Sequence, residues 1–248
     1  MTFLRLGRLA AFFLVATVSL ASAAEPLTPA QEDAVRGIVR TYLIENPEVL
    51  IEALQAYESK LAGEAQKRQE AALVQRREQL ERDPTSPVGG APDGDVTLVE
   101  FTDYRCGYCK RVFPTVQDLL KADGRIRYVI KELPVLGPES VVAARAALAV
   151  WRSTPNKYMA FHAAMMTARG NLDETRIMEL AAETGLDATA LAKAMKDPEI
   201  NAVLAKNHEL AQALNINGTP AFVVGGRLIP GAVDADTLRQ LVAAARQG

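Results

Sequence analysis

The sequence predicts an α/β protein in which a helical N-terminal segment precedes a mixed domain. Residues 96–102, 127–133 and 221–224 have the short, apolar, β-branched character that is typical of strands. The stretch from about 139 to 214, between the second and third of these strands, is predicted to be a helical insert. Two consecutive glycines at 225–226 predict a tight hairpin turn from the third strand into a fourth at 227–229.

The first 23 residues are predicted to be an export signal. Arg5 and Arg8 form a basic region, and the apolar run 9–20 is too short to cross a bilayer as a helix. The small residues 21–23 then supply a cleavage pattern, so the mature chain is expected to begin near Ala24. A retained membrane anchor is the alternative interpretation. An exported protein enters an oxidising compartment, where disulfides form.

The charge balance argues against polyanionic partners. The chain has 28 basic and 30 acidic residues, a net charge of −2. Loss of Arg5 and Arg8 with the signal would change that charge from −2 to −4. Neither value provides the basic surface that nucleic acid or an anionic membrane requires, so no nucleic-acid partner is expected.

The segment 24–82 is expected to be helical and to mediate oligomerisation. Thr28 followed by a proline is a helix start signal, and Asn46-Pro47 repeats it, so a break between two helices is predicted there. Apolar residues then recur at coiled-coil spacings, at Leu50, Leu54, Tyr57 and Leu61. The charged stretch 66–82 could pack on the main domain or pair with copies of itself, and pairing is favoured.

Residues 83–95 are rich in proline, glycine and aspartate, a composition typical of a linker. The main domain is therefore expected to span residues 96–248. Its first helix is predicted over 110–120 and to end near Gly124, a C-cap signal. A closing helix is predicted over 236–246.

The two cysteines of the chain, Cys106 and Cys109, stand three residues apart between a predicted strand and a predicted helix. A C-x-x-C pair in this position favours a redox dithiol, because a helix N-terminus stabilises a thiolate. A zinc site would need two more ligands, and His162 and His208 lack metal-ligand spacing. A purely structural bridge would close too small a loop to stabilise much.

Three motifs in this order resemble the thioredoxin fold in its DsbA-like form. They are residues 101–110 around the cysteine pair, residues 218–223 around a Thr-Pro pair, and Glu100, six residues before the first cysteine. With the N-terminal helical extension, the chain is most similar to the branch of suppressor-of-copper-sensitivity C (ScsC) and Com1-like proteins. This resemblance implies a thioredoxin fold with a helical insertion, preceded by an oligomerisation segment that forms trimers in known members.

The resemblance also implies how the cysteines act. Cys106 is expected to be exposed at the helix start and to attack a substrate disulfide, and the more buried Cys109 is expected to resolve the mixed disulfide. Gly107 and Tyr108 between them would contact substrate and tune the reduction potential. Because Tyr108 cannot carry positive charge, a less oxidising site than that of DsbA is expected.

The remaining site residues are also assigned by resemblance. Pro220 is expected to follow a cis peptide bond facing the dithiol, and Thr219 to offer its backbone to an extended substrate. Glu100 would relay the proton of Cys109; the alternative is a solvent-facing strand residue. His162 is expected to be a packing residue.

The function that these features imply is that of an oligomeric periplasmic disulfide isomerase without cofactor or metal. Its expected partners are unfolded or misoxidised exported proteins and a DsbD-like membrane reductase that keeps Cys106 reduced. One alternative is a monomeric DsbA-like oxidase. Another is a copper-binding or copper-tolerance protein that uses the same dithiol, although the helical spacing of four methionines fits a core better: Met159, Met165, Met166 and Met178.

Overall fold

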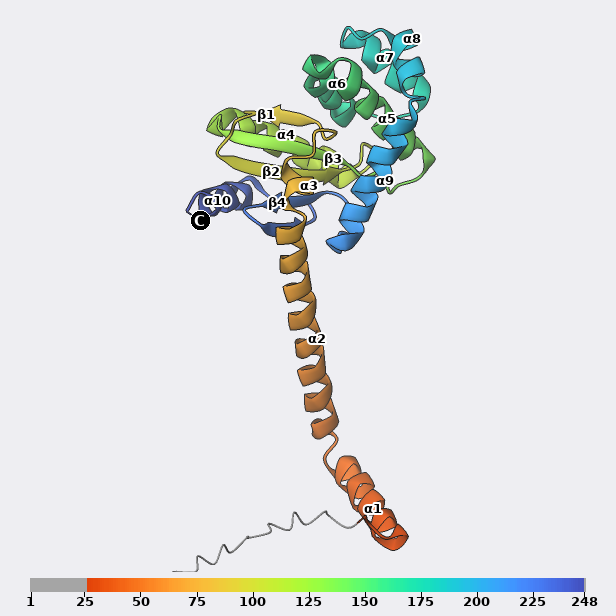
Figure 1. Cartoon of the computed structure of the whole chain (residues 1–248), viewed down its shortest axis with the longest axis vertical. Coiled ribbons are helices and arrows are strands. Elements are labelled where there is room, and N and C mark those ends of the chain that lie inside the picture. Colours follow the sequence, from red (N-terminus) through yellow and green to blue (C-terminus); the bar gives the residue numbers. More distant parts are fainter. Residues whose placement is uncertain (1–25, 248) are drawn as a thin grey trace, which may run out of the picture. The chain divides into compact units, whose positions relative to one another are not determined.

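The computed structural model describes residues 26–247 (Figure 1). The predicted export signal, 1–23, lies outside the described residues. The chain divides into two compact units, the first ending at Ser59 and the second beginning at Lys60. The helix α2, Glu48–Gln75, contributes residues to both units.

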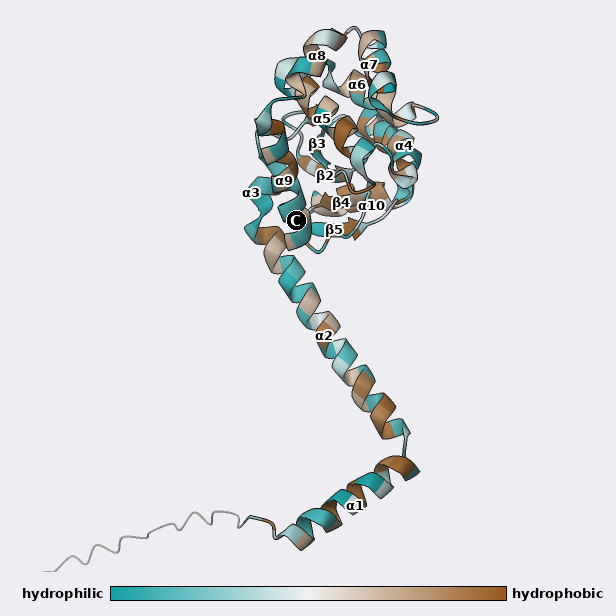
Figure 2. Ribbon diagram, turned by 90° about the vertical axis from the view of Figure 1, so that its right-hand side faces the viewer, coloured by the Kyte–Doolittle hydropathy of each residue, from teal (hydrophilic) through white to brown (hydrophobic). Residues whose placement is uncertain are grey.

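The first unit contains helix α1, Pro29–Glu45, and the beginning of α2. Thr28 caps α1 through a reciprocal capping box with Gln31, and the helix ends at Asn46, so the predicted start and break are confirmed. Many large apolar side chains of this unit are exposed. They are Leu27, Val35, Ile38, Val39, Tyr42, Ile44, Leu50, Ile51, Leu54 and Tyr57. Figure 2 marks the hydrophobic positions along α1 and α2 in brown.

The second unit is built on a five-stranded mixed sheet with the order β1-β3-β2-β4-β5. Strands β2 and β3 are parallel, and the other neighbours are antiparallel. Four of the strands were predicted to within one or two residues, and β1 was not. Their bounds are β1 Val88–Gly90, β2 Val96–Thr102, β3 Ile126–Glu132, β4 Ala221–Val224 and β5 Arg227–Pro230.

The prediction that residues 83–95 form a linker is wrong for most of that stretch. It contains β1, which pairs with β3. The carboxylate of Asp83 is buried and lies 2.8 Å from the ammonium of Lys206. Ser86 accepts a hydrogen bond of 2.7 Å from the buried ammonium of Lys131. These partners lie far along the chain, so the composition of the stretch could not reveal them.

The end of the charged stretch 66–82 packs on the domain, whereas pairing with copies of the chain was favoured. Leu73 at the end of α2 and Leu80 in α3, Arg77–Glu81, are both buried. They belong to a hydrophobic cluster with residues of the sheet and of a later helix, among them Val99, Phe101, Val129, Leu210 and Val223. Both leucines are almost completely removed from water, so their burial helps to hold this end on the domain.

Seven more helices complete the second unit, and the insert runs from α5 to α9 as predicted. Their bounds are α4 Gly107–Asp123, α5 Pro138–Ser153, α6 Pro155–Thr167, α7 Glu174–Glu183, α8 Ala188–Ala194, α9 Pro198–Ala213 and α10 Ala235–Ala245. Gly124 ends α4 in the left-handed conformation, as its C-cap signal indicates.

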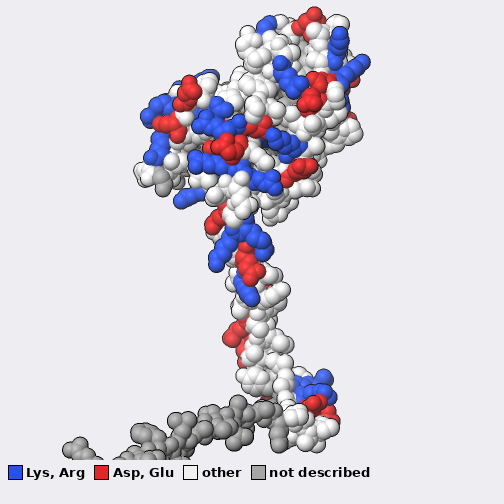
Figure 3. All heavy atoms as spheres, viewed as in Figure 1, with Lys and Arg blue, Asp and Glu red and all other residues white. Residues whose placement is uncertain are grey.

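Strand β2 separates two hydrophobic clusters because its side chains alternate between the faces of the sheet. Leu98 packs in the larger cluster, with α4, α10 and the insert helices. Val99 packs in the smaller one, with α9 and the end of α2. The dithiol helix is thus held on one face of the sheet and the end of α2 on the other. On the face drawn in Figure 3, acidic and basic side chains are interspersed.

Candidate functional site

Cys106 is the N-cap of α4, directly after strand β2 and a short loop. Its thiol donates a hydrogen bond of 3.2 Å to the carbonyl oxygen of Thr219. The peptide bond between Thr219 and Pro220 is cis, as the resemblance implies. The expected exposure of Cys106 is wrong, because only 6 % of the residue is accessible. The segment that contacts its sulfur comes from more than 100 positions later in the chain.

Cys109 lies one helical turn further on and is completely buried. Burial raises the pKa of its thiol, and the charge of Glu100 raises that pKa further. Between the cysteines, Gly107 borders open space and Tyr108 is 59 % exposed. The guanidinium of Arg111 lies 4.5 Å from the centre of the Tyr108 ring. The exposed part of the dithiol motif is therefore its central dipeptide, where a substrate can approach.

Glu100 is buried in the centre of β2, so the alternative of a solvent-facing residue is wrong. Strand β2 is covered on both faces, which is why the alternation of its sequence was misleading. The hydroxyl of Tyr128 on β3 donates a 2.5 Å hydrogen bond to the carboxylate. Burial raises the pKa of Glu100 to about 7, and the bond from Tyr128 opposes part of that rise. A carboxyl with this pKa can both accept and release a proton near neutral pH.

Asp103, which the sequence analysis did not single out, anchors the loop before Cys106. One carboxylate oxygen accepts from the backbone of Arg105 and the hydroxyl of Ser140, each at 2.8 Å. The other accepts from the backbone of Val135 and Leu136, at 2.9 and 3.1 Å. The loop that delivers Cys106 is thereby attached to the segment between β3 and α5. Only the three-dimensional structure reveals this role, because the partners Val135, Leu136 and Ser140 are more than 30 positions away.

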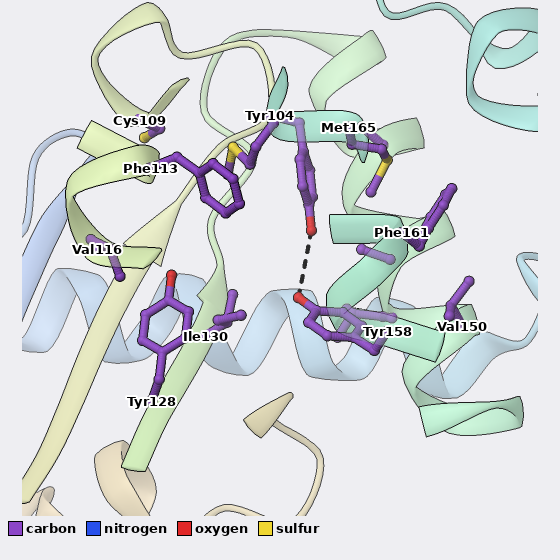
Figure 4. Packing of buried hydrophobic residues seen from close by; sticks show 14 of the residues in the cluster. Tyr104, Cys109, Phe113, Val116, Tyr128, Ile130, Val150, Tyr158, Phe161 and Met165 are labelled. Atoms are coloured by element: carbon purple, nitrogen blue, oxygen red, sulfur yellow. Dashed lines mark hydrogen bonds between the residues drawn. The ribbon is translucent and has the colours of Figure 1, made fainter. Parts of the chain in front are cut away.

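Another buried carboxyl, that of Glu132 at the end of β3, was also missed. One of its oxygens accepts hydrogen bonds from the hydroxyls of Tyr104, at 2.8 Å, and Tyr158, at 2.9 Å. The hydroxyl of Tyr104 also lies 2.7 Å from Nδ1 of His162. Figure 4 shows the two tyrosines facing each other between α6 and the loop before the dithiol. Burial raises the pKa of Glu132 to about 8.

His162 is completely buried, and its ring meets that of Phe113 on α4 edge to face. The prediction of a packing residue is therefore confirmed, although the histidine also takes part in the polar cluster. Burial lowers its pKa to about 3, so it is neutral at physiological pH. Nε2 of His162 and the second oxygen of Glu132 lack hydrogen-bond partners among residues 26–247.

Neither a metal site nor a membrane span is found among the described residues. They include no group of three or more histidine, cysteine, aspartate or glutamate side chains arranged to hold an ion. Met165 and Met166 are buried in the larger hydrophobic cluster, and Met159 and Met178 pack against it, as their helical spacing indicates. Within the same part of the chain, the helices are too short or too polar to cross a bilayer.

Comparison with known proteins agrees with this geometry. The family described as DSBA-like thioredoxin domain matches residues 97–243. The family described as copper resistance protein ScsC N-terminal domain matches residues 31–72, which cover most of α1 and α2.

Solved structures show the same likeness. A thioredoxin-like oxidoreductase from Silicibacter pomeroyi is 46 % identical, with a TM-score of 0.67 over 69 % of this chain and 98 % of that one. The catalytic domain of Proteus mirabilis ScsC is 34 % identical, with a TM-score of 0.67 over 72 % of this chain and 99 % of that one.

One curated relative is a much longer protein. The Na(+)/H(+) antiporter NhaA of Herminiimonas arsenicoxydans is 30 % identical over 65 % of this chain, but the match spans only 26 % of the antiporter. Taken with the cis-proline loop facing Cys106, the matches show that the chain belongs to the DsbA-like thioredoxin family of thiol–disulfide oxidoreductases and carries an N-terminal segment of the ScsC type.

Proposed function

We propose that this protein is an oligomeric periplasmic disulfide isomerase in which Cys106 attacks and Cys109 resolves. The contact between the thiol of Cys106 and the carbonyl oxygen of Thr219 is the observation that supports the site most strongly. A backbone group at this distance can hold an extended substrate whose disulfide lies against the nucleophile. The buried Cys109 is protected from substrate and meets only a sulfur already joined to Cys106.

The reaction begins when the thiolate of Cys106 attacks one sulfur of a substrate disulfide. A mixed disulfide forms, and the other substrate sulfur leaves as a thiolate. In isomerisation, a substrate thiolate attacks the mixed disulfide, forms a new substrate disulfide and returns the electron pair to Cys106. If the mixed disulfide persists, Glu100 accepts the proton of Cys109, whose thiolate then attacks Cys106 and releases the reduced substrate.

The isomerase direction is inferred from the N-terminal unit. Many large apolar residues on its helices α1 and α2 are exposed, and soluble monomers rarely leave large contiguous apolar patches in water. Self-association would cover these residues and gather several dithiols in one assembly that acts on misoxidised exported proteins. Release of reduced substrate leaves a disulfide between the two cysteines, so a membrane reductase of the DsbD type would be needed to supply electrons.

The mass of the mature protein in solution, together with refolding of scrambled ribonuclease, tests this proposal. We expect an oligomer that restores ribonuclease activity. A double variant, Leu54→Glu with Tyr57→Glu, should be monomeric and lose most of that activity, whereas the neighbouring Gln55→Glu should behave as wild type. A monomeric wild-type protein that oxidises reduced ribonuclease would instead support the DsbA-like oxidase. Cu(I) binding that disappears with both cysteines would support the copper-binding alternative.

A further inference from the structure

Two adjoining clefts lie where the end of α2 passes the last strand of the sheet. The larger has a volume of about 1310 Å³ and lies between α2, the end of α9 and the turn from β4 to β5. The smaller has a volume of about 420 Å³ and includes the loop that carries Thr219 and Pro220. Gln69, Asn215 and Leu228 line both clefts. Together the clefts form one groove from α2 to the cis-proline loop.

The groove borders an open sheet edge. Among the described strands, β5 pairs with β4 and has no neighbour on its other side. The residues of β5 are exposed or half-buried, and Leu228 is half-buried between the sheet and α2. A free strand edge presents backbone donors and acceptors that can pair with an extended polypeptide.

Gln69 connects the helical wall of the groove to the loop at its end. Its side-chain amide donates a 3.0 Å hydrogen bond to the carbonyl oxygen of Leu214 at the end of α9. Asn215 follows in the left-handed conformation, with φ of 56°, and turns the chain toward the cis-proline loop. The amides of Gln69, Asn215 and Asn217 can each donate to and accept from a peptide backbone.

We infer that residues 62–73 of α2 form one wall of the substrate cleft, and that the occupant is an extended segment of the disulfide-bearing polypeptide. Continuity supports this occupant, because the groove ends at the residue whose carbonyl oxygen contacts the thiol of Cys106. The charged lining residues Arg68, Glu70 and Arg227 have mixed signs, so the groove does not favour a strongly charged ligand. Amide side chains and a free strand edge instead suit a peptide backbone.

The helix that continues into the oligomerisation segment would therefore also contact substrate. This inference rests on the proposed dithiol chemistry, and it holds for either direction of electron flow. A small disulfide reaches Cys106 without filling the groove, whereas a polypeptide must lie along it. Peptide and small-molecule substrates should consequently respond differently to changes in α2.

Saturation kinetics of the reduced, mature, full-length protein test the inference with two substrates. One is a peptide of twelve residues with an internal disulfide, and the other is 5,5′-dithiobis(2-nitrobenzoate). A single turnover is measured, so that the dithiol itself supplies the two electrons; KM is then the half-saturating substrate concentration and kcat the limiting rate. Gln69→Ala should raise the KM for the peptide roughly five-fold, because one hydrogen bond to the peptide backbone is lost. The kcat for the peptide and the rate with the small disulfide should stay unchanged. The matched control is Gln75→Ala, an exposed position on the same helix, which should change neither.

A second pair of variants changes the groove without removing the hydrogen bond between Gln69 and Leu214. Ala65→Trp should partly fill the groove and raise the KM for the peptide at least as much, whereas Ala71→Trp, exposed but outside the lining, should not. Unchanged peptide kinetics in both Gln69→Ala and Ala65→Trp would overturn the inference. An equal loss with both substrates would overturn it too, because α2 would then only support the loop. Wild-type protein that reduces neither substrate would instead refute the dithiol chemistry.

Discussion

Glu100 and Glu132 lie on neighbouring parallel strands, and both are buried, yet their surroundings give them different tasks. Opposite Glu100 stands Ile130, two residues before Glu132. Burial raises the pKa of both carboxyls, to about 7 and about 8. The charge of Glu100 acts on the thiol of Cys109. The hydrogen bonds of Glu132 instead connect the end of the sheet to Tyr104 before the dithiol and to α6 of the insert.

A raised pKa therefore does not by itself identify a carboxyl that carries protons in the reaction. Desolvation alone shifts any buried carboxyl, whatever its role. What distinguishes Glu100 is a group nearby that must lose a proton during the reaction. Glu132 accepts hydrogen bonds from the hydroxyls of Tyr104 and Tyr158. We therefore assign it a structural role, which is to join the insert to the dithiol site.

The largest effect should come from the cysteines, because the assignment of Glu100 depends on Cys109 being the resolving thiol. Cys106→Ser should abolish exchange, and Cys109→Ser should accumulate a stable mixed disulfide with a protein substrate. Mass spectrometry under non-reducing conditions measures the adduct. An adduct in Cys106→Ser, formed through Cys109, would show that Cys109 is the attacking cysteine. Glu100 would then have no resolving thiol to deprotonate, and the difference in role between Glu100 and Glu132 would lose its basis.

The second-largest effect should be on the rate of the resolving step, where substitution of Glu100 and of Glu132 should have different consequences. Glu100→Gln should slow the resolving step at pH 7 by roughly 10²-fold, the usual contribution of a positioned general base. Glu132→Gln should change it less than about three-fold, because no reacting group lies beside it in this account. Quenched-flow measurement of the release of a peptide thiol checks both variants. Equal slowing in the two would show that burial, and not position, determines the effect.

A smaller effect should appear in the pH dependence of stability. Each carboxyl has a folded-state pKa above its ordinary value of 4.5, so its stabilising contribution is present below that pH and is lost as the pH rises. The loss extends to about pH 7 for Glu100 and to about pH 8 for Glu132. Between pH 5 and pH 8, Glu132→Gln should therefore retain on the order of 3 kcal/mol of unfolding free energy that the wild type loses.

Urea denaturation of the reduced protein at several pH values measures this difference. Glu100→Gln should show a similar but smaller gain, complete by about pH 7. A wild-type stability that does not fall relative to Glu132→Gln over this range would mean that Glu132 is ionised in the folded protein throughout.

The smallest effect should come from removing the tyrosine hydroxyls that donate hydrogen bonds to the two carboxyls. Tyr128→Phe removes the hydrogen bond that lowers the pKa of Glu100, so the pH midpoint of the resolving step should rise by up to about one unit. Tyr104→Phe removes a donor to Glu132 and should leave that midpoint in place. The pH profile of the resolving rate compares the two phenylalanine variants. A rise with Tyr104→Phe alone would exchange the roles of the two carboxyls.

The sequence was sufficient for features that are local in the chain. The dithiol at a helix start, the glycine that ends α4 and the predicted break before Pro47 each depend on neighbouring residues, and each is present in the structure. Glu100 was found by its distance from the motif. Glu132 has no such marker, since its partners Tyr104 and Tyr158 lie 28 and 26 positions away.

Other features were missed because distant residues decide them. Strand β1 has three residues, two of them glycine, and exists because β3 offers it an edge. The end of α2 looked like a polar helix, but Leu73 and Leu80 fit a hydrophobic cluster formed by other elements. The exposure of Cys106 was misjudged because Thr219, which contacts its sulfur, is brought there by the whole insert.

Glu100 is expected to exchange a proton with the dithiol near neutral pH. Carbon-13 NMR of the labelled Glu100 carboxyl in the reduced protein, assigned by its loss in Glu100→Gln, measures the pKa on which this exchange depends. A titration midpoint of about 7 is the predicted result. A midpoint near the ordinary value of 4.5 would contradict it, because the carboxyl would then be ionised at all working pH values and could not carry the proton of Cys109.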